Sequence, residues 1–414
     1  MRIFKSSRGR LAQAGLALAC HALLWPAPAR AQIVAPRESA QIEFGPVSLY
    51  PSLVVADAGK DSNVFNDSQA PRQDYTFTLQ SRALVVTRLG LNELMFSTGS
   101  DYVWFRQYKQ ERSSNAAYAV RFNFSASRFK PFIGAQDLRS RTRPNPEIDA
   151  RIRHVDRQGT GGLAFDLTER TSINAGAVFD DSSYDKGQFF RGIDLSQALD
   201  RKGRAYFGGI GYAVTPLTTL LLAGRYAEDL FPLSHLRDSK LYSFAPTLQF
   251  STDAAIRGQV SVGVEVFKPK DTQFAAYKGA TYDALVSWSL FGDVTSFDVR
   301  GTRNVNYSYK VDSPYYLITG ARLGVTQKFV GPFDLTAAAD REYLSYRWHV
   351  GAAGIVDSHP QADTTDVLSG GIGINMKRGF KVVLTVEKTR RHANTDPTLN
   401  YRRTRLLSTI TVGS

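Results

Sequence analysis

The chain has 414 residues, of which 43% are apolar and 21% charged, a balance that excludes a disordered or collagen-like protein. No run of about 18 apolar residues occurs, so the sequence does not predict a bundle of transmembrane helices. The 25 Phe, 19 Tyr and 33 Gly, set against three Met and one Cys, favour strands over helices.

Residues 1–31 have the features of a secretory signal peptide. A basic start precedes an apolar run, and Ala29, Arg30 and Ala31 form an A-x-A cleavage site. Cleavage before Gln32 removes five basic residues and no acidic one, which lowers the net charge from +13 to +8. Lipidation of Cys20 is the weaker alternative, because the apolar run continues past it. The mature chain then has no cysteine, which excludes disulfides, thiol catalysis and Cys-ligated zinc.

From Val47 onward the dominant signal is an alternation of apolar and polar residues with period two. In the segment 259–266, Val occupies every even position, whereas Gln, Ser, Gly and Glu occupy the odd ones. Segments of this kind are often 12 to 15 residues long, whereas strands of soluble proteins are typically about 5 to 6 residues. Long strands with one apolar and one polar face are what a membrane-spanning barrel requires.

Connections between these segments alternate between long and short along the chain. Nine long connections and eight short turns, such as Leu89–Asn92, predict about 18 strands, with 16 as the alternative count. Short periplasmic turns and longer extracellular loops are typical of outer-membrane barrels of Gram-negative bacteria. The fold prediction is therefore an all-β, antiparallel, up-and-down transmembrane barrel over residues 47–414, preceded by a periplasmic lead over 32–46.

Charged residues on the polar face of the strands are the candidate pore lining. A lipid-facing Arg or Lys at mid-depth costs about 2–4 kcal/mol, so these residues are expected to face water. The basic candidates are Arg82, Arg121, Arg225, Arg257, Arg300, Arg322, Lys381 and Arg405. The acidic candidates are Glu265, Asp283, Asp298 and Asp340. The basic set predicts anion conduction, and the alternative is a balanced cross-strand ladder in which the acids neutralise the bases.

A second group of basic residues is expected near the extracellular rim. Its members are Arg141, Arg143, Arg151, Arg153, Lys388 and Arg391. They would capture or release an anionic ligand or bridge lipopolysaccharide phosphates, and the alternative is a solvated rim. Neither the histidine spacing nor the acidic loops form a recognisable metal motif, and no nucleophile motif occurs, so we expect no metal, cofactor, nucleic-acid partner or enzymatic activity.

The first predicted hairpin carries the most specific motif of the chain. The segment 45–53, with Pro51, is followed by a loop that reads Asp61-Ser62-Asn63-Val64-Phe65. This pattern resembles the opening of the putative beta-barrel porin 2 family, with Lys60 in place of the usual aromatic before Asp61. The resemblance implies an outer-membrane barrel and an association with exopolysaccharide synthesis and export. It implies no catalytic residue.

Three functions follow as hypotheses. The first is passive export of an extracellular polysaccharide, together with periplasmic export components. The second is a general or anion-preferring diffusion porin for small solutes. The third is a structural or adhesin barrel that does not conduct. Lipid and lipopolysaccharide of the outer membrane are expected partners in all three.

Overall fold

The computed structural model describes residues 42–252, 254–329, 331–346, 361–376, 380–394 and 396–412. Within these residues, eighteen long antiparallel strands form a closed ring, β2 to β8 and β11 to β21. Each strand pairs with the next in the chain, β8 pairs with β11, and β21 pairs with β2 to close the ring. The predicted eighteen-stranded barrel is confirmed.

The strand bounds are as follows: β2 Val47–Asp61, β3 Asp74–Leu89, β4 Asn92–Phe105, β5 Ser113–Asn123, β6 Phe129–Thr142, β7 Ile152–Asp166, β8 Thr171–Tyr184, β11 Arg201–Thr215, β12 Thr218–Leu230, β13 Ser239–Phe250, β14 Ile256–Pro269, β15 Tyr277–Leu290, β16 Thr295–Tyr307, β17 Tyr315–Lys328, β18 Phe333–Tyr346, β19 Ala362–Asn375, β20 Lys381–Ala393 and β21 Tyr401–Val412. Three short strands and one short α-helix are also described: β1 Ile42–Phe44, β9 Phe189–Phe190, β10 Ile193–Asp194 and α2 Leu195–Leu199. Three single-turn 3-10 helices complete the described elements: η3 Lys109–Glu111, η4 His235–Arg237 and η6 Pro397–Leu399. Among the described residues, no helix is both long and apolar enough to span a membrane.

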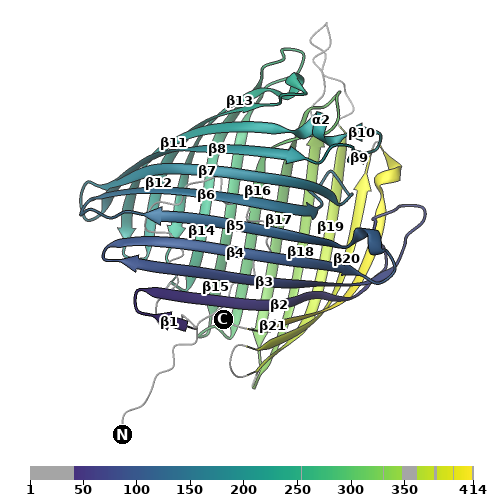
Figure 1. Ribbon diagram of the computed structural model, residues 1–414, viewed down its shortest axis with the longest axis horizontal. Helices are drawn as coiled ribbons and strands as arrows, with labels where there is room; N and C mark the ends of the chain where they lie inside the picture. Colours follow the sequence, from purple (N-terminus) through teal and green to yellow (C-terminus); the bar gives the residue numbers. More distant parts are fainter. Residues whose placement is uncertain are drawn as a thin grey trace.

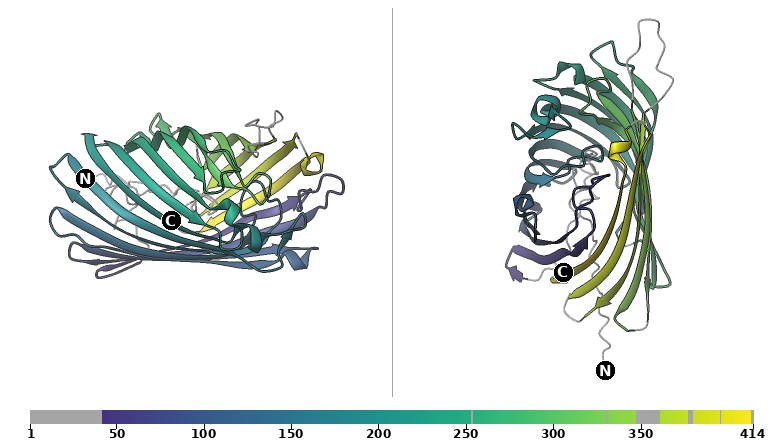
Figure 2. Two further views of the ribbon diagram at one scale, coloured as in Figure 1. Left: turned by 90° about the horizontal axis from the view of Figure 1, so that it is seen from above. Right: turned by 90° about the vertical axis from the view of Figure 1, so that its right-hand side faces the viewer.

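The strands are strongly tilted, as closure of a sheet into a barrel requires. In Figure 1 the front wall, β2 to β8 and β11, runs across the strands of the back wall at a steep angle. Figure 2 shows the two walls curving around a common interior. The short helix α2 and the short strands β9 and β10 lie together at the long-loop end.

Each strand turns one face outward and the other toward the lumen. On β14, Val262 is 54% exposed on the outer face, whereas its neighbour Ser261 is 7% exposed and accepts a hydrogen bond from the Thr247 hydroxyl (3.0 Å) inside. The same alternation holds around the ring, because adjacent strands pair in register with apolar positions opposite apolar positions. The outer face is therefore an apolar band suited to lipid, and the inner face is polar.

The ring closes at a seam between the first and last strands. The seam needs a bulge in β2, where the register shifts between Val55 and Ala58 and Asp57 has a positive φ of 52°. A side chain at Gly59 would place its Cβ 1.9 Å from the backbone oxygen of Leu406, so only glycine allows β21 to approach. Pro51 lies in β2 before the pairing with β21 begins at Leu53, so its missing N–H leaves no gap in that ladder.

The predicted periplasmic lead contains one ordered element. Gly45 has a φ of 58°, which permits a tight turn, and β1 pairs back onto the start of β2 through the partners Phe44 and Val47. The predicted signal peptide, its cleavage site before Gln32 and Cys20 lie outside the described residues.

Candidate functional site: the lumen and its loop-covered mouth

Four of the basic pore-lining candidates form ion pairs on the inner face. Arg82 contacts Asp101 (2.5 Å), Arg322 contacts Asp340 (3.6 Å) and Lys381 contacts Asp334 (3.0 Å). Arg405 pairs with Glu387, and its Nε donates to Oε1 at 2.9 Å. These pairs join neighbouring strands, which is the arrangement of a balanced ladder.

The other four basic candidates have no carboxylate within 4.0 Å among the described residues. Arg121 donates to Asn123 Oδ1 (2.9 Å), and its guanidinium lies 4.3 Å from the ring centroid of Phe132. Arg257 donates to the Ser289 hydroxyl. Arg225 lies on the inner face of β12, and Arg300 lies directly opposite Arg322 across β16 and β17.

The acidic candidates share this inner face. Glu265 is buried on β14, and Asp283 lies opposite Ser261. Asp298 accepts a hydrogen bond from the Ser287 hydroxyl (2.5 Å), and Asp340 holds Arg322. The wall of the lumen is therefore a mixed ladder of acids and bases rather than a uniformly basic lining.

The long-loop end of the barrel is crossed by a loop cluster. The β6–β7 loop, residues 143–151, reaches the β16–β17 loop, residues 308–314, although the two hairpins lie on opposite sides of the ring. The contact is made by Glu147, which is 1% exposed. Its carboxylate accepts hydrogen bonds from the Ser308 hydroxyl (2.7 Å) and the Tyr309 backbone N–H (3.2 Å). Burial raises the pKa of Glu147 to about 7, against the lowering effect of these donors and of Lys310.

A buried cation on β20 ties the same loop to a third side of the ring. Arg391 is 2% exposed and forms ion pairs with Asp149 of the β6–β7 loop (2.5 Å) and with Asp363 of β19 (2.7 Å). It also donates to the backbone oxygen of Pro146 (3.0 Å). Removing the cation from such a site leaves buried carboxylates without a partner.

Arg237, in the β12–β13 loop, fixes the other side of the β16–β17 loop. Its guanidinium donates to the backbone oxygens of Ser308 (2.8 Å), Tyr309 (2.7 Å) and Lys310 (2.9 Å). Burial lowers the pKa of Arg237 to about 10, which still leaves it charged near neutral pH. One side chain thus satisfies three carbonyls of the β16–β17 loop.

An apolar cluster fills the space under these polar contacts. Three segments contribute to it: the β6–β7 hairpin, the β8–β11 connection that contains α2, and the β16–β17 loop. Its buried members are Ile148, Ile152, Phe190, Leu195, Ala198, Leu199 and Tyr309. The Phe190 and Tyr309 rings pack edge to face at 5.0 Å. The loop cluster therefore has a small core of its own.

The family-like first hairpin lies at the barrel seam. Asp61 is 2% exposed, forms an ion pair with Arg403 of β21 and accepts a hydrogen bond from the backbone N–H of Asn63 (2.9 Å). Asn63 donates to the backbone oxygen of Arg402 (3.3 Å). Phe65 packs edge to face against Tyr108 (4.8 Å). The motif thus fastens the first strand to the last.

The six basic rim candidates do not form one surface. Arg141 and Arg151 both contact Glu111, and Arg143 donates to the backbone oxygens of Asp149 (2.8 Å) and Val64 (2.9 Å). Burial lowers the pKa of Arg151 to about 10.

Arg153 and Lys388 are exposed at outward positions of β7 and β20, whereas Arg391 is buried within the loop cluster. Arg391 is one of the predicted rim cations, and Asp149 and Asp363 enclose its guanidinium, so it is not open to an anionic ligand.

Sequence reasoning missed Glu147, Arg237, Lys310 and Arg191 as residues of the mouth. Glu147 and Ser308 are 161 positions apart in the chain, and no local pattern relates them. No group of three or more His, Cys, Asp or Glu residues in the described part of the chain is arranged to hold a metal ion.

A closed ring of long strands, with an apolar outer band, a polar lumen, short turns at one end and longer loops at the other, defines an outer-membrane β-barrel porin. Residues 36–413 match the sequence profile of the putative beta-barrel porin 2 family, and the chain belongs to this family. The family and the fold are those of channels.

Several solved structures are similar to this chain at low identity. OccK3 (OpdO) of Pseudomonas aeruginosa is 11% identical, with 88% of this chain and 96% of that chain covered and a TM-score of 0.44. A BenF-like porin of Pseudomonas fluorescens Pf-5 is 11% identical, with coverage of 88% and 99% and a TM-score of 0.46. The siderophore receptor PirA of Pseudomonas aeruginosa is 8% identical, with coverage of 88% and 80% and a TM-score of 0.41. No curated protein matches the sequence significantly.

Proposed function

We propose that the protein is a diffusion channel for small polar solutes, with a mouth narrowed by the loop cluster on the extracellular side of the outer membrane. The observation that carries this proposal is the contact of Glu147 with Ser308 and Tyr309, which spans opposite sides of the ring. A loop that crosses the mouth and is buried at its contact point limits the cross-section more than the strand count alone would.

The mixed lining of the lumen supports weak charge selectivity. Half of the predicted basic residues are paired with carboxylates, so the net field along the wall is small. Arg121, Arg257 and Arg300, which face no carboxylate within 4.0 Å among the described residues, favour anions slightly. Low selectivity suits a channel that passes hydrophilic solutes by size.

Passive export of a polysaccharide is the second candidate function. It is supported by the family resemblance of the first hairpin and by the width of an eighteen-stranded barrel, which accommodates an aqueous lumen. Export requires the loop cluster to move aside, because the Glu147 contact stands in the path of a polymer chain.

The outer face supports contact with lipid and lipopolysaccharide. A row of charges joins four adjacent strands near the long-loop end, with Asp137 opposite Arg157, Arg157 opposite Asp181 and Asp181 opposite Lys202. This row lies above large exposed apolar residues such as Ile133. We propose that it marks the headgroup level, after export of the chain and signal-peptide cleavage before Gln32.

Planar-bilayer recording combined with a deletion strain tests the proposal. Purified protein should give discrete conductance steps, and small neutral polymers should enter the pore while larger ones are excluded. The deletion strain should take up small solutes more slowly without polysaccharide accumulating in the periplasm. Accumulation of polysaccharide would instead favour export, and the absence of conductance steps would favour a non-conducting structural or adhesin barrel.

A further inference from the structure

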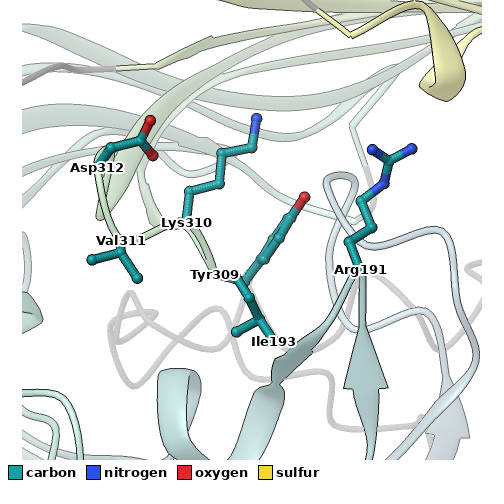
Figure 3. A pocket seen from close by; sticks show the side chains of 6 residues that line it. All are labelled: Arg191, Ile193, Tyr309, Lys310, Val311 and Asp312. Atoms are coloured by element: carbon teal, nitrogen blue, oxygen red, sulfur yellow. The ribbon is translucent and has the colours of Figure 1, made fainter.

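The loop cluster contains a cavity that the proposed function does not by itself require. It has a volume of about 440 Å³ and lies between the β8–β11 connection and the β16–β17 loop. Its lining residues are Arg191, Ile193, Tyr309, Lys310, Val311 and Asp312 (Figure 3). This volume is within the range of small-molecule sites in proteins. Val311 and Asp312 are exposed, so the cavity is open to solvent.

The polar groups of the cavity have complementary chemistry. In Figure 3 the Lys310 ammonium, the Tyr309 hydroxyl and the Arg191 guanidinium point to the same side, with Asp312 beside Lys310. The apolar side chains of Ile193 and Val311 complete the lining. A ligand that fits this cavity has a negative charge for the two cations and hydroxyl groups that can hydrogen-bond with Tyr309 and Asp312. Its carbon skeleton is small enough to pack against the apolar side chains.

Arg191 and Lys310 differ in how many hydrogen-bond and ion-pair partners they already have within the protein. Arg191 forms an ion pair with Asp396 and donates to the Thr398 hydroxyl (2.6 Å), so its charge is shared. The Lys310 ammonium lies 4.1 Å from the ring centroid of Tyr346 and has no carboxylate within 4.0 Å among the described residues. Burial lowers the pKa of Lys310 against the raising effect of the more distant Glu147, Asp363 and Asp312, and a bound anion would offset the burial further. Lys310 is therefore the residue with donors left for a ligand.

The backbone beneath the cavity is held by hydrogen bonds on both sides of Lys310. The Lys310 N–H donates to the Ser308 hydroxyl (3.0 Å), and the Lys310 carbonyl accepts from Arg237 (2.9 Å). Ser308 is in turn held by Glu147. The site is thus formed before a ligand arrives, which reduces the ordering cost of binding.

We propose that this cavity is a binding site for a small hydroxylated carboxylate, such as a sugar acid, at the mouth of the channel. The inference rests on the proposed function and deepens it by naming a solute class. Lys310 binds the carboxylate, Tyr309 and Asp312 bind hydroxyl groups, and Arg191 adds long-range attraction. The site would raise the local concentration of such solutes at the entrance of the lumen.

Calorimetric titration of the intact protein in detergent tests the site independently of conduction. Galacturonate, galactose and galactosamine serve as probes of similar size that carry a negative, no and a positive charge. Galacturonate should bind at least about tenfold more tightly than galactose, because a hydrogen bond to a charged group is involved. Equal binding of galacturonate and galactose, or no binding of either, would overturn the inference.

Variants locate the binding. Lys310→Met should weaken galacturonate binding about tenfold or more, with a smaller loss for Arg191→Gln, whose charge is already shared with Asp396. The matched control is Lys268→Met, because Lys268 is exposed on the outer face above the Tyr242 ring. Lys310→Gln provides a second variant if the Met variant assembles poorly. Unchanged binding in both Lys310 variants would overturn the assignment.

Bilayer recording separates this inference from the proposed function. If the wild-type channel conducts but binds no galacturonate, the diffusion function is supported and the binding site is refuted. If the protein binds galacturonate but gives no conductance, the binding site is supported and the diffusion function is refuted. If both hold, galacturonate added on the loop side should reduce the current, and Lys310→Met should diminish that reduction.

Discussion

The wall of the barrel and the loop cluster at its mouth are stabilised in different ways. In the wall, contacts join neighbouring strands, and the ion pairs, such as Arg82 with Asp101, connect residues that the hairpin already brings together. In the mouth, buried charges connect distant segments, as Arg391 does with Asp149. We therefore expect single charge changes to perturb the inner face of the wall less than the mouth, whose contacts depend on a few residues.

The largest effect is expected for Arg391→Met, which removes the cation between Asp149 and Asp363. Removing one partner of a buried ion pair costs about 3–5 kcal/mol, and here the loss falls on the loop cluster. Hydrogen exchange in residues 143–151 should accelerate and the single-channel conductance should rise, while the barrel stays resistant to detergent. Arg341→Met is the control, because Arg341 pairs with Asp366 at an outward, exposed position. Unchanged exchange would show that the mouth does not depend on Arg391.

The next effect concerns the wall and compares two adjacent positions. Val262→Arg places a charge on the outer face and should cost about 2–4 kcal/mol in the membrane, whereas Ser261→Arg places it in the lumen opposite Asp283. The heat-modifiable mobility of the folded barrel on gels should be lost for Val262→Arg and kept for Ser261→Arg. Equal damage from both substitutions would mean that the register is shifted by one residue.

The mouth is expected to respond to pH through Glu147. Glu147, which is buried beside Ser308 and near Lys310 and Arg237, has a pKa raised to about 7 from 4.5. The closed loop therefore favours the protonated form. The stabilisation that Glu147 contributes is fully present below about 4.5 and is lost as the pH rises through about 7.

Conductance should therefore increase as the pH rises through about 7. Glu147→Gln mimics the protonated side chain and should keep the low conductance above that pH. The control is Glu228→Gln, because Glu228 of β12 lies opposite the outward Arg204 and pairs with it and with Lys270; this variant should behave as the wild type. A wild-type conductance that does not change across this range would contradict the assignment of Glu147 as the contact that titrates.

The smallest expected effect is on ion selectivity. Replacing Arg121, Arg257 and Arg300 together by Gln should reduce a weak anion preference, because these inner-face bases form no ion pair within 4.0 Å among the described residues. Reversal potentials in a salt gradient measure the change. At about 1 M salt the Debye length is near 3 Å, so the preference should fade.

An outer-face triple variant controls for net charge. Arg139, Arg157 and Arg204 point outward and are largely exposed, so their replacement by Gln removes the same charge without altering the lumen. Selectivity should stay at the wild-type value in this variant. Cation preference in the wild type would indicate that the inner acids outweigh the bases.

The same contrast explains what the sequence could predict. The strand number, the turns such as Leu89–Asn92 and the two faces of each strand follow from period two and local turn chemistry. Successive residues of a strand point alternately to lipid and to the lumen, so the sequence alone distinguishes the outward Val262 from the inward Ser261. The roles of Glu147 and Arg391 are not, because their partners lie 161 and 242 positions away. Arg391 therefore reads as a rim cation although it is buried.

The seam between β2 and β21 has a consequence for the order of assembly. Asp61 and Arg403 are 342 positions apart, so the contact forms only after nearly the whole chain has been made and delivered. Each hairpin can form early because its closing loop is short, whereas the seam carries the largest loop-closure entropy.

Until the seam forms, both edge strands present unpaired backbone groups, which hydrocarbon does not tolerate. Asp61, Asn63 and Gly59 all lie at this junction. Asp61 forms the ion pair with β21, Asn63 donates a side-chain hydrogen bond to the β21 backbone, and Gly59 permits the close approach at the bulge. The motif of the first hairpin thus forms the surface to which the last strand binds. A substitution there should leave the barrel unclosed, as an open sheet that proteases can cleave.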